Sequence, residues 1–236
     1  MTKTEIKTLG DAFAHILLSH AAHGLATSSL EGTGEITLRD GLIVGAAAVA
    51  ARLKHAWILK REVLPQGWDD AAVDLLISRE GNNDPHPIAG VELKWWRQLD
   101  AGNAANRRRD LVKDFVRAAA LYTLVEDVSF VALLSTRGSW EATANTNGSD
   151  AEAMQKLSSS GVQKWNVSNL SDCASVRGSV NYLQNRVPIC NIFHTELLSS
   201  CSLTMAGVEM AFAKVWTVKK PQRTRFLDAD DIAELI

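Results

Sequence analysis

Three short apolar segments, each followed by turn-forming residues, constrain the fold of this chain more than any other feature. The three segments cover residues 56–64, 72–78 and 88–96. Pro65 and Gly67 follow the first segment, and Gly81 and Pro85 stand between the second and the third. Because such residues favour turns, the pattern predicts three β-strands that pair in sequence as a meander.

Helical patterns stand on both sides of the predicted meander. Residues 38–54 are rich in alanine and glycine, which predicts a helix that approaches a sheet closely. The second pattern, in residues 105–125, has an apolar stripe made of Leu111, Phe115, Ala118 and Tyr122. An apolar run at 128–135 predicts a buried strand, parallel to a neighbour because a helical crossover precedes it. The core order α-β-β-β-α-β predicts an α/β fold with a mixed sheet and helices on both faces.

The length of 236 residues suits one domain that spans residues 1–236. Its predicted core covers about 35–136, preceded by a helix at 4–23 and followed by an extension at about 138–236. Hydrophobic residues make up 46% of the chain and charged residues 22%, which is typical of a globular protein with a full core. Two late segments are expected to extend the sheet, near 192–203 and 210–217.

Composition also excludes several classes of protein. The longest apolar run, Leu42 to Ala51, is too short to span a bilayer, and the first residues lack the pattern of a secretion signal. We therefore expect a cytoplasmic protein without a membrane partner. Three distant cysteines without a CxxC pair argue against disulfides and a cysteine-rich zinc site. Because the net charge is −2, contacts with nucleic acid must come from local patches.

Charged side chains interrupt the second and third predicted strands. Asp74 lies in one, and Glu92 and Lys94 lie in the next on a common face, because side chains alternate along a strand. A hairpin centred on Asn83 would place Asp74 across from Glu92, whereas a shift by one residue would turn Asp74 to the other face. Two facing carboxylates repel each other, so this arrangement requires a cation between them.

Mg²⁺ meets this requirement, because it prefers carboxylate oxygens and retains several waters; Mn²⁺ is expected to substitute. A bound ion polarises a scissile phosphate and promotes ionisation of an attacking water. Lys94 would stabilise the charge that develops on the phosphate or orient the water. The alternative is purely structural: Asp74 forms a partly buried ion pair with Lys94, and Glu92 is solvated.

The motif formed by these residues resembles the signature of the PD-(D/E)XK nuclease superfamily, the restriction-endonuclease-like fold. It consists of Val73-Asp74 followed, after seventeen residues, by Glu92-Leu93-Lys94. The core order of that family, helix, three-stranded meander, helix and strand, matches the order predicted here. The resemblance covers about 100 residues, from 38 to 135, and its motif is short.

The resemblance implies a role for each matched residue. Asp74 and Glu92 would bind the metal, the backbone carbonyl of Leu93 would join them, and Lys94 would be the catalytic lysine. Val73 stands where the motif has proline, which lowers the specificity of the match.

Members of the family often add an acid from the helix before the meander, and Glu35 and Asp40 are both candidates here. Glu62, at the end of the first strand, is a further candidate. Glu35 is also explained by the dipole of a helix that begins there, and Glu62 by ordinary surface exposure.

The resemblance further implies that the helix after the meander supports the site and contacts the nucleic-acid backbone. Its candidate nucleic-acid-binding residues are Arg107, Arg108, Arg109, Lys113 and Arg117. The alternatives are a solvated basic face and an Asp114–Arg117 surface pair, which would contribute little stability.

The sequence thus predicts a Mg²⁺-dependent endonuclease that hydrolyses DNA. An RNA-cleaving enzyme of the same fold and a non-catalytic nucleic-acid-binding or assembly module remain alternatives. A homodimer fits the endonuclease hypothesis, because cutting both strands of a DNA duplex needs two sites.

Overall fold

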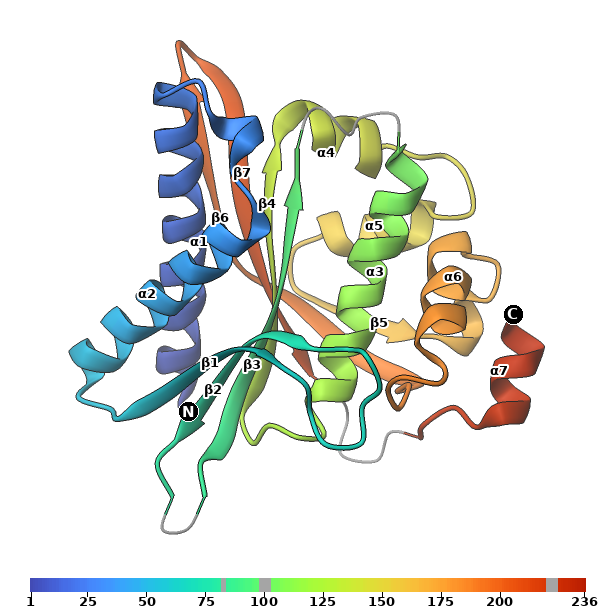
Figure 1. The fold of residues 1–236 in the computed structure, drawn as a ribbon. Helices are drawn as coiled ribbons and strands as arrows, with labels where there is room; N and C mark the ends of the chain where they lie inside the picture. Colours follow the sequence, from blue (N-terminus) through green and yellow to red (C-terminus); the bar gives the residue numbers. More distant parts are fainter. Residues whose placement is uncertain (82–83, 98–102, 220–224) are drawn as a thin grey trace.

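A computed structural model of the protein describes residues 1–81, 84–97, 103–219 and 225–236. In this part of the chain a seven-stranded mixed sheet has the order β1-β2-β3-β4-β7-β6-β5 (Figure 1). The strands are β1 (Trp57–Val63), β2 (Val73–Arg79), β3 (His86–Trp96), β4 (Val128–Thr136), β5 (Val162–Asn166), β6 (Ile192–Met205) and β7 (Val208–Lys219). The α-helices are α1 (Lys3–Ala26), α2 (Glu35–Leu53), α3 (Ala104–Leu121), α4 (Arg137–Ala144), α5 (Ala151–Ser158), α6 (Ala174–Leu183) and α7 (Ala229–Leu235).

The connectivity of the first four strands follows the predicted order. β1, β2 and β3 form an antiparallel meander after α2, and α3 then leads to β4, which is parallel to β3. The expectation that two late segments extend the sheet is confirmed, because β7 pairs with β4 and β6 pairs with β7. The short strand β5 adds a further strand beyond β6.

Helices cover both faces of the sheet, so the predicted α/β class is confirmed (Figure 1). α1 and α2 pack on one face around a core that includes Phe13, Leu42 and Phe130. α3 and the helices after it pack on the other face, around Phe115 and Trp216. Burial on both faces explains why β4 reads as a continuous apolar run without alternation.

The helix pair α1–α2 is positioned by small residues. A Cβ atom at Gly41 would lie 2.5 Å from His20 Nε2, so glycine permits the close approach of the two helices. α2 ends where Lys54 takes a left-handed conformation, with φ of 58°. Among the described residues, no helix is both long and apolar enough to cross a membrane.

Candidate functional site

The pairing of β2 with β3 brings the three predicted site residues together. The ladder pairs Leu75 with Val91, which is the predicted register, and Asp74 is the next residue along β2; Asn83 lies outside the described residues. Asp74 Oδ2 accepts a hydrogen bond from the backbone N–H of Leu93 at 2.7 Å. Burial raises the pKa of Glu92 most strongly, and the negative charge of Asp74 raises it further.

Arg39 of α2 is the direct partner of Asp74. Its Nη2 lies 2.7 Å from Asp74 Oδ1, and its Nη1 lies 2.6 Å from Glu62 Oε1. Glu62 therefore reaches the site through Arg39, from an exposed position at the end of β1. One guanidinium thus links the helix before the meander to two of its strands.

Glu92 is completely buried, and Arg117 of α3 is its partner. Both carboxylate oxygens of Glu92 accept hydrogen bonds from Arg117, and Arg117 Nη2 also donates to the Ala72 carbonyl at 3.1 Å. Burial raises the pKa of Glu92 to about 8, although the positive charge of Arg117 opposes this rise. The alternative in which Asp74 pairs with Lys94 and Glu92 is solvated is therefore wrong, because arginines neutralise both acids.

Lys94 lies between two other acids. Its Nζ is 3.5 Å from Asp114 Oδ2 and 3.8 Å from Glu35 Oε1. Asp114 contributes most to raising the pKa of Lys94, and Glu35 and Asp74 raise it further, so the amine remains protonated over the physiological range. The site therefore holds Lys94 as a cation.

Asp114 belongs to the helix that was expected to support the site, and the alternative made it half of a surface pair with Arg117. That alternative is wrong: Asp114 is buried, and Arg117 binds Glu92. A signal was present, because Asp114 falls between Leu111 and Ala118 on the apolar stripe of α3, where a charged side chain requires a partner. Burial raises the pKa of Asp114, whereas Lys94 and Arg117 lower it.

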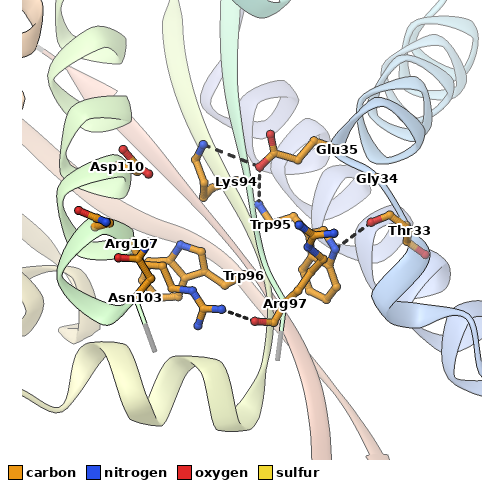
Figure 2. Close-up of a pocket in the computed structure, with 11 residues that line it drawn as sticks. Thr33, Gly34, Glu35, Lys94, Trp95, Trp96, Arg97, Asn103, Arg107 and Asp110 are labelled. Carbon is orange, nitrogen blue, oxygen red and sulfur yellow. Dashed lines mark hydrogen bonds and ion pairs between the residues drawn. The ribbon is translucent and has the colours of Figure 1, made fainter. Parts of the chain in front are cut away.

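A cleft of about 610 Å³ opens beside Lys94. Figure 2 shows Lys94 from β3 and Glu35 from the first turn of α2 approaching each other at one wall, with Asp110 of α3 on the opposite side. Glu35 Oε1 also accepts a hydrogen bond from the backbone N–H of Trp95 at 3.1 Å, which attaches α2 to β3. Asp40, the other candidate acid of α2, instead pairs with Arg61 at 2.6 Å on the surface.

The five predicted nucleic-acid-binding cations of α3 have different surroundings. Arg107 lines the cleft and donates to the Arg97 carbonyl, whereas Arg108 binds Asp150 on another side of the helix. Arg117 is committed to Glu92, as described above. The remaining two, Arg109 and Lys113, line a separate groove between α3 and α6. The structure therefore does not gather the five into one exposed patch.

We expect Arg108→Ala to lower the free energy of unfolding by about 1.5–3 kcal/mol, because Arg108 binds a largely buried carboxylate. Arg108 Nε donates to Asp150 Oδ2 at 2.8 Å, and Asp150 Oδ1 accepts from the backbone N–H of Ser175 at 2.7 Å. Urea denaturation measures the change, and oligonucleotide affinity should not change. Arg109→Ala is the matched control; a larger destabilisation by that variant would contradict the assignment.

The carboxylates of the site have donor chemistry that fits Mg²⁺. Within the described ranges, no group of three or more Asp, Glu, His or Cys side chains is arranged to hold a metal ion. Mg²⁺ needs only one or two carboxylates beside waters and phosphate oxygens, and the candidates for this role are Asp74 and Glu92 on adjacent strands. Asp114 Oδ2 is buried without a hydrogen-bond partner in the described part of the chain, which leaves acceptor capacity at the site. A cation that binds there must compete with Arg39 and Arg117.

Taken together, these features define an α/β protein whose seven-stranded mixed sheet carries a cluster of acids and cations beside an open cleft. The cluster contains the acids Glu35, Asp74, Glu92 and Asp114 and the cations Arg39, Lys94 and Arg117. Comparison with family models, with curated proteins and with solved structures gives no match in any of the three. Inferences about function therefore depend on the geometry of this cluster.

Proposed function

We propose that the protein is a Mg²⁺-dependent nuclease that hydrolyses phosphodiester bonds in DNA. The observation that carries the proposal is the position of Lys94, a protonated amine at the wall of a cleft, next to the strand pair that holds Asp74 and Glu92. Hydrolysis of a phosphodiester requires anionic metal ligands and a separate cation for the developing charge, and the site contains carboxyl groups and a separate ammonium group.

The order of elements around the site also supports the proposal. α2, the β1-β2-β3 meander, α3 and the parallel strand β4 follow one another as in the core of the PD-(D/E)XK superfamily. We propose that residues 35–136 form a restriction-endonuclease-like core, and that the later strands enlarge its sheet. Glu35 would be the additional acid from the first core helix.

Each side chain then has a defined task. Asp74 and Glu92, with the backbone carbonyl of Leu93, would hold the ion. When bound, Mg²⁺ polarises the scissile phosphate and makes the attacking water more acidic. Lys94 places its charge next to the phosphate oxygens, and Asp114 holds Lys94 in position from α3. Glu35 also pairs with Lys94 at the mouth of the cleft, and it anchors β3 by accepting a hydrogen bond from the backbone of Trp95.

The two arginines favour a second candidate function, a non-catalytic nucleic-acid-binding or assembly module. Arg39 and Arg117 already neutralise Asp74 and Glu92, so the acids do not require a metal for folding. Calorimetric titration with Mg²⁺ and Mn²⁺ separates the two functions. Binding of the ion supports the nuclease, whereas no binding, together with nucleic-acid affinity that is independent of the ion, favours the module.

A cleavage assay tests the nuclease directly. Plasmid DNA, single-stranded DNA and RNA are incubated with Mg²⁺, Mn²⁺ or EDTA, and the substrate that is cut distinguishes a deoxyribonuclease from a ribonuclease. We expect Asp74→Asn to raise the Mg²⁺ concentration for half-maximal cleavage about tenfold or more, because it removes one charged ligand. Sedimentation with and without duplex tests whether a homodimer supplies two sites.

Asp40→Asn is the matched control for that assay, because Asp40 pairs with Arg61 on the surface of α2. It should cleave like the wild type at every metal concentration. The assignment fails if no substrate is cut in a divalent-ion-dependent manner, or if Asp74→Asn and Asp40→Asn have the same metal dependence.

A further inference from the structure

A second groove, of about 700 Å³, lies between α3, α6 and the segment that follows β1. Tyr182 of α6 lines it and is 46% exposed. Lys113 Nζ lies 4.7 Å and Arg186 Cζ 4.4 Å from the centre of the Tyr182 ring. The groove thus combines an accessible aromatic ring with cations at the distance of cation–π contacts.

The cations of the groove are only loosely neutralised. Lys113 pairs with Asp110 at 3.2 Å, and Arg186 pairs with Asp70 at 2.9 Å. The acidic side chains are 38% exposed for Asp110 and 86% exposed for Asp70. Because ion pairs of such exposure contribute little, a phosphate group can replace the carboxylates as the partner of both cations.

The groove adjoins the cleft that holds Lys94. Asp110 lines both, so the two hollows lie on either side of one stretch of α3. Lys113 faces the groove, whereas the adjacent Asp114 contacts Lys94. A chain of nucleotides bound at Lys94 can therefore continue across Asp110 into the groove.

Two further features suit a nucleotide. The amide side chains of Asn181 and Asn185 line the groove and can both donate to and accept from the edge of a base. Gly178 permits Arg109 to lie against α6, since a Cβ atom there would be 2.7 Å from Arg109 Cδ. Arg109 thus adds a third cation to the groove.

We propose that this groove binds a nucleotide of an unpaired strand, with its base stacked on Tyr182 and its phosphate held by Lys113 and Arg186. Stacking on a side chain requires a base that is free of its complementary strand, so the groove selects single-stranded nucleic acid. The inference rests on the proposed nuclease function for the course of the strand, but its test measures binding alone.

Fluorescence anisotropy with labelled single-stranded DNA, single-stranded RNA and duplex DNA in EDTA provides the test, because no metal-dependent cleavage occurs. We expect Tyr182→Ala to weaken single-strand binding about 5- to 100-fold, as loss of one stacking platform does, and to leave duplex affinity unchanged. Tyr182→Trp, which retains a stacking surface, should bind single strands like the wild type. A preference between the DNA and RNA strands identifies the sugar that is recognised.

Equal single-strand affinity of the wild type and Tyr182→Ala would overturn the proposal, as would an equal loss for single strands and duplex. The variant Lys94→Ala distinguishes a failure of the groove from a failure of the nuclease assignment, because this substitution leaves the groove intact. Binding that depends on Tyr182 in a protein without nuclease activity would support the groove and reject the nuclease. Cleavage by the wild type, together with single-strand binding by Tyr182→Ala that equals the wild type, would support the nuclease and reject the groove.

Discussion

Replacing Arg117 with methionine is expected to lower the free energy of unfolding by about 1–3 kcal/mol at pH 8, because it leaves the buried Glu92 carboxyl without its hydrogen-bond partner. Arg117 binds both oxygens of Glu92, which is completely buried. The methionine retains most of the apolar stem of the arginine, so the lost contribution is mainly the polar contact with Glu92.

The effect should depend on pH, and its sign follows from the pKa of Glu92. Burial raises this pKa to about 8 even with Arg117 present, and loss of the guanidinium raises it further. An unfolded glutamate titrates near its ordinary pKa of about 4.3. Between these values the unfolded chain releases a proton that the folded protein retains, in the wild type and in the variant alike, so the stability of both falls as pH rises. The loss caused by the substitution should therefore be similar at pH 5 and 6.5 and should grow above pH 8, where Glu92 ionises only in the wild type.

Urea denaturation at pH 5, 6.5, 8 and 9.5 measures both the size and the pH dependence of the loss. The double variant Glu92→Leu/Arg117→Met should recover most of the stability and lose the pH dependence, because neither charge remains buried. Arg186→Met is the control for removing an arginine from an exposed pair, and it should cost less than about 1 kcal/mol. Stability of Arg117→Met equal to the wild type at pH 8 would contradict the assigned role.

The sequence predicted the meander and its register because local rules determine both. Each strand is short, is bounded by turn residues and carries apolar side chains on the faces that the helices cover. A slip by one residue would have turned the apolar residues Leu75 and Ile77 away from the core formed with α1 and α2, so the hydrophobic pattern selects one register. The proximity of Asp74 and Glu92 follows from that register.

The partners of the acids were beyond the reach of the sequence pattern. Arg39 lies on α2 and Arg117 on α3, and nothing in their spacing shows that they meet Asp74 and Glu92 across the end of β2. Strand alternation determines the face of a side chain but not the helix that covers it. The requirement for a cation was therefore recognised, and arginines supply it in this structure.

In residues 138–236 the two long strands were predicted from the sequence. β6 and β7 pair over most of their length and carry enough apolar residues to be recognised. β5 has five residues, and Gly178 together with Ser175 and Ser179 interrupts the helical pattern of α6. Tyr182 could have been singled out as an aromatic residue near Arg186, but its contact with Lys113 depends on how α6 packs on α3.

Lys94→Ala is expected to reduce the cleavage rate about 10²- to 10³-fold, the usual effect of removing one group that stabilises charge in the transition state. Affinity for Mg²⁺ should be unchanged or slightly higher, because Lys94 is not a ligand and its charge opposes a nearby cation. Single-turnover cleavage at saturating Mg²⁺ separates the rate from the affinity. Lys94→Arg should restore part of the rate, since it retains the charge but not the position of Nζ.

The variant Asp114→Asn tests whether Asp114 holds the amine of Lys94 in a catalytic position or whether Lys94 only fills space. Misplacing a catalytic group by about 1 Å can reduce a rate on the order of 100-fold, so we expect a loss of about 10- to 100-fold. Asp114 contributes most to raising the pKa of Lys94, and its removal should move the alkaline decline of activity to lower pH. A rate loss without a change in the pH profile would mean that Asp114 stabilises the fold around Lys94 but does not control its charge. A shifted profile would show that α3 controls the cation through a buried carboxylate.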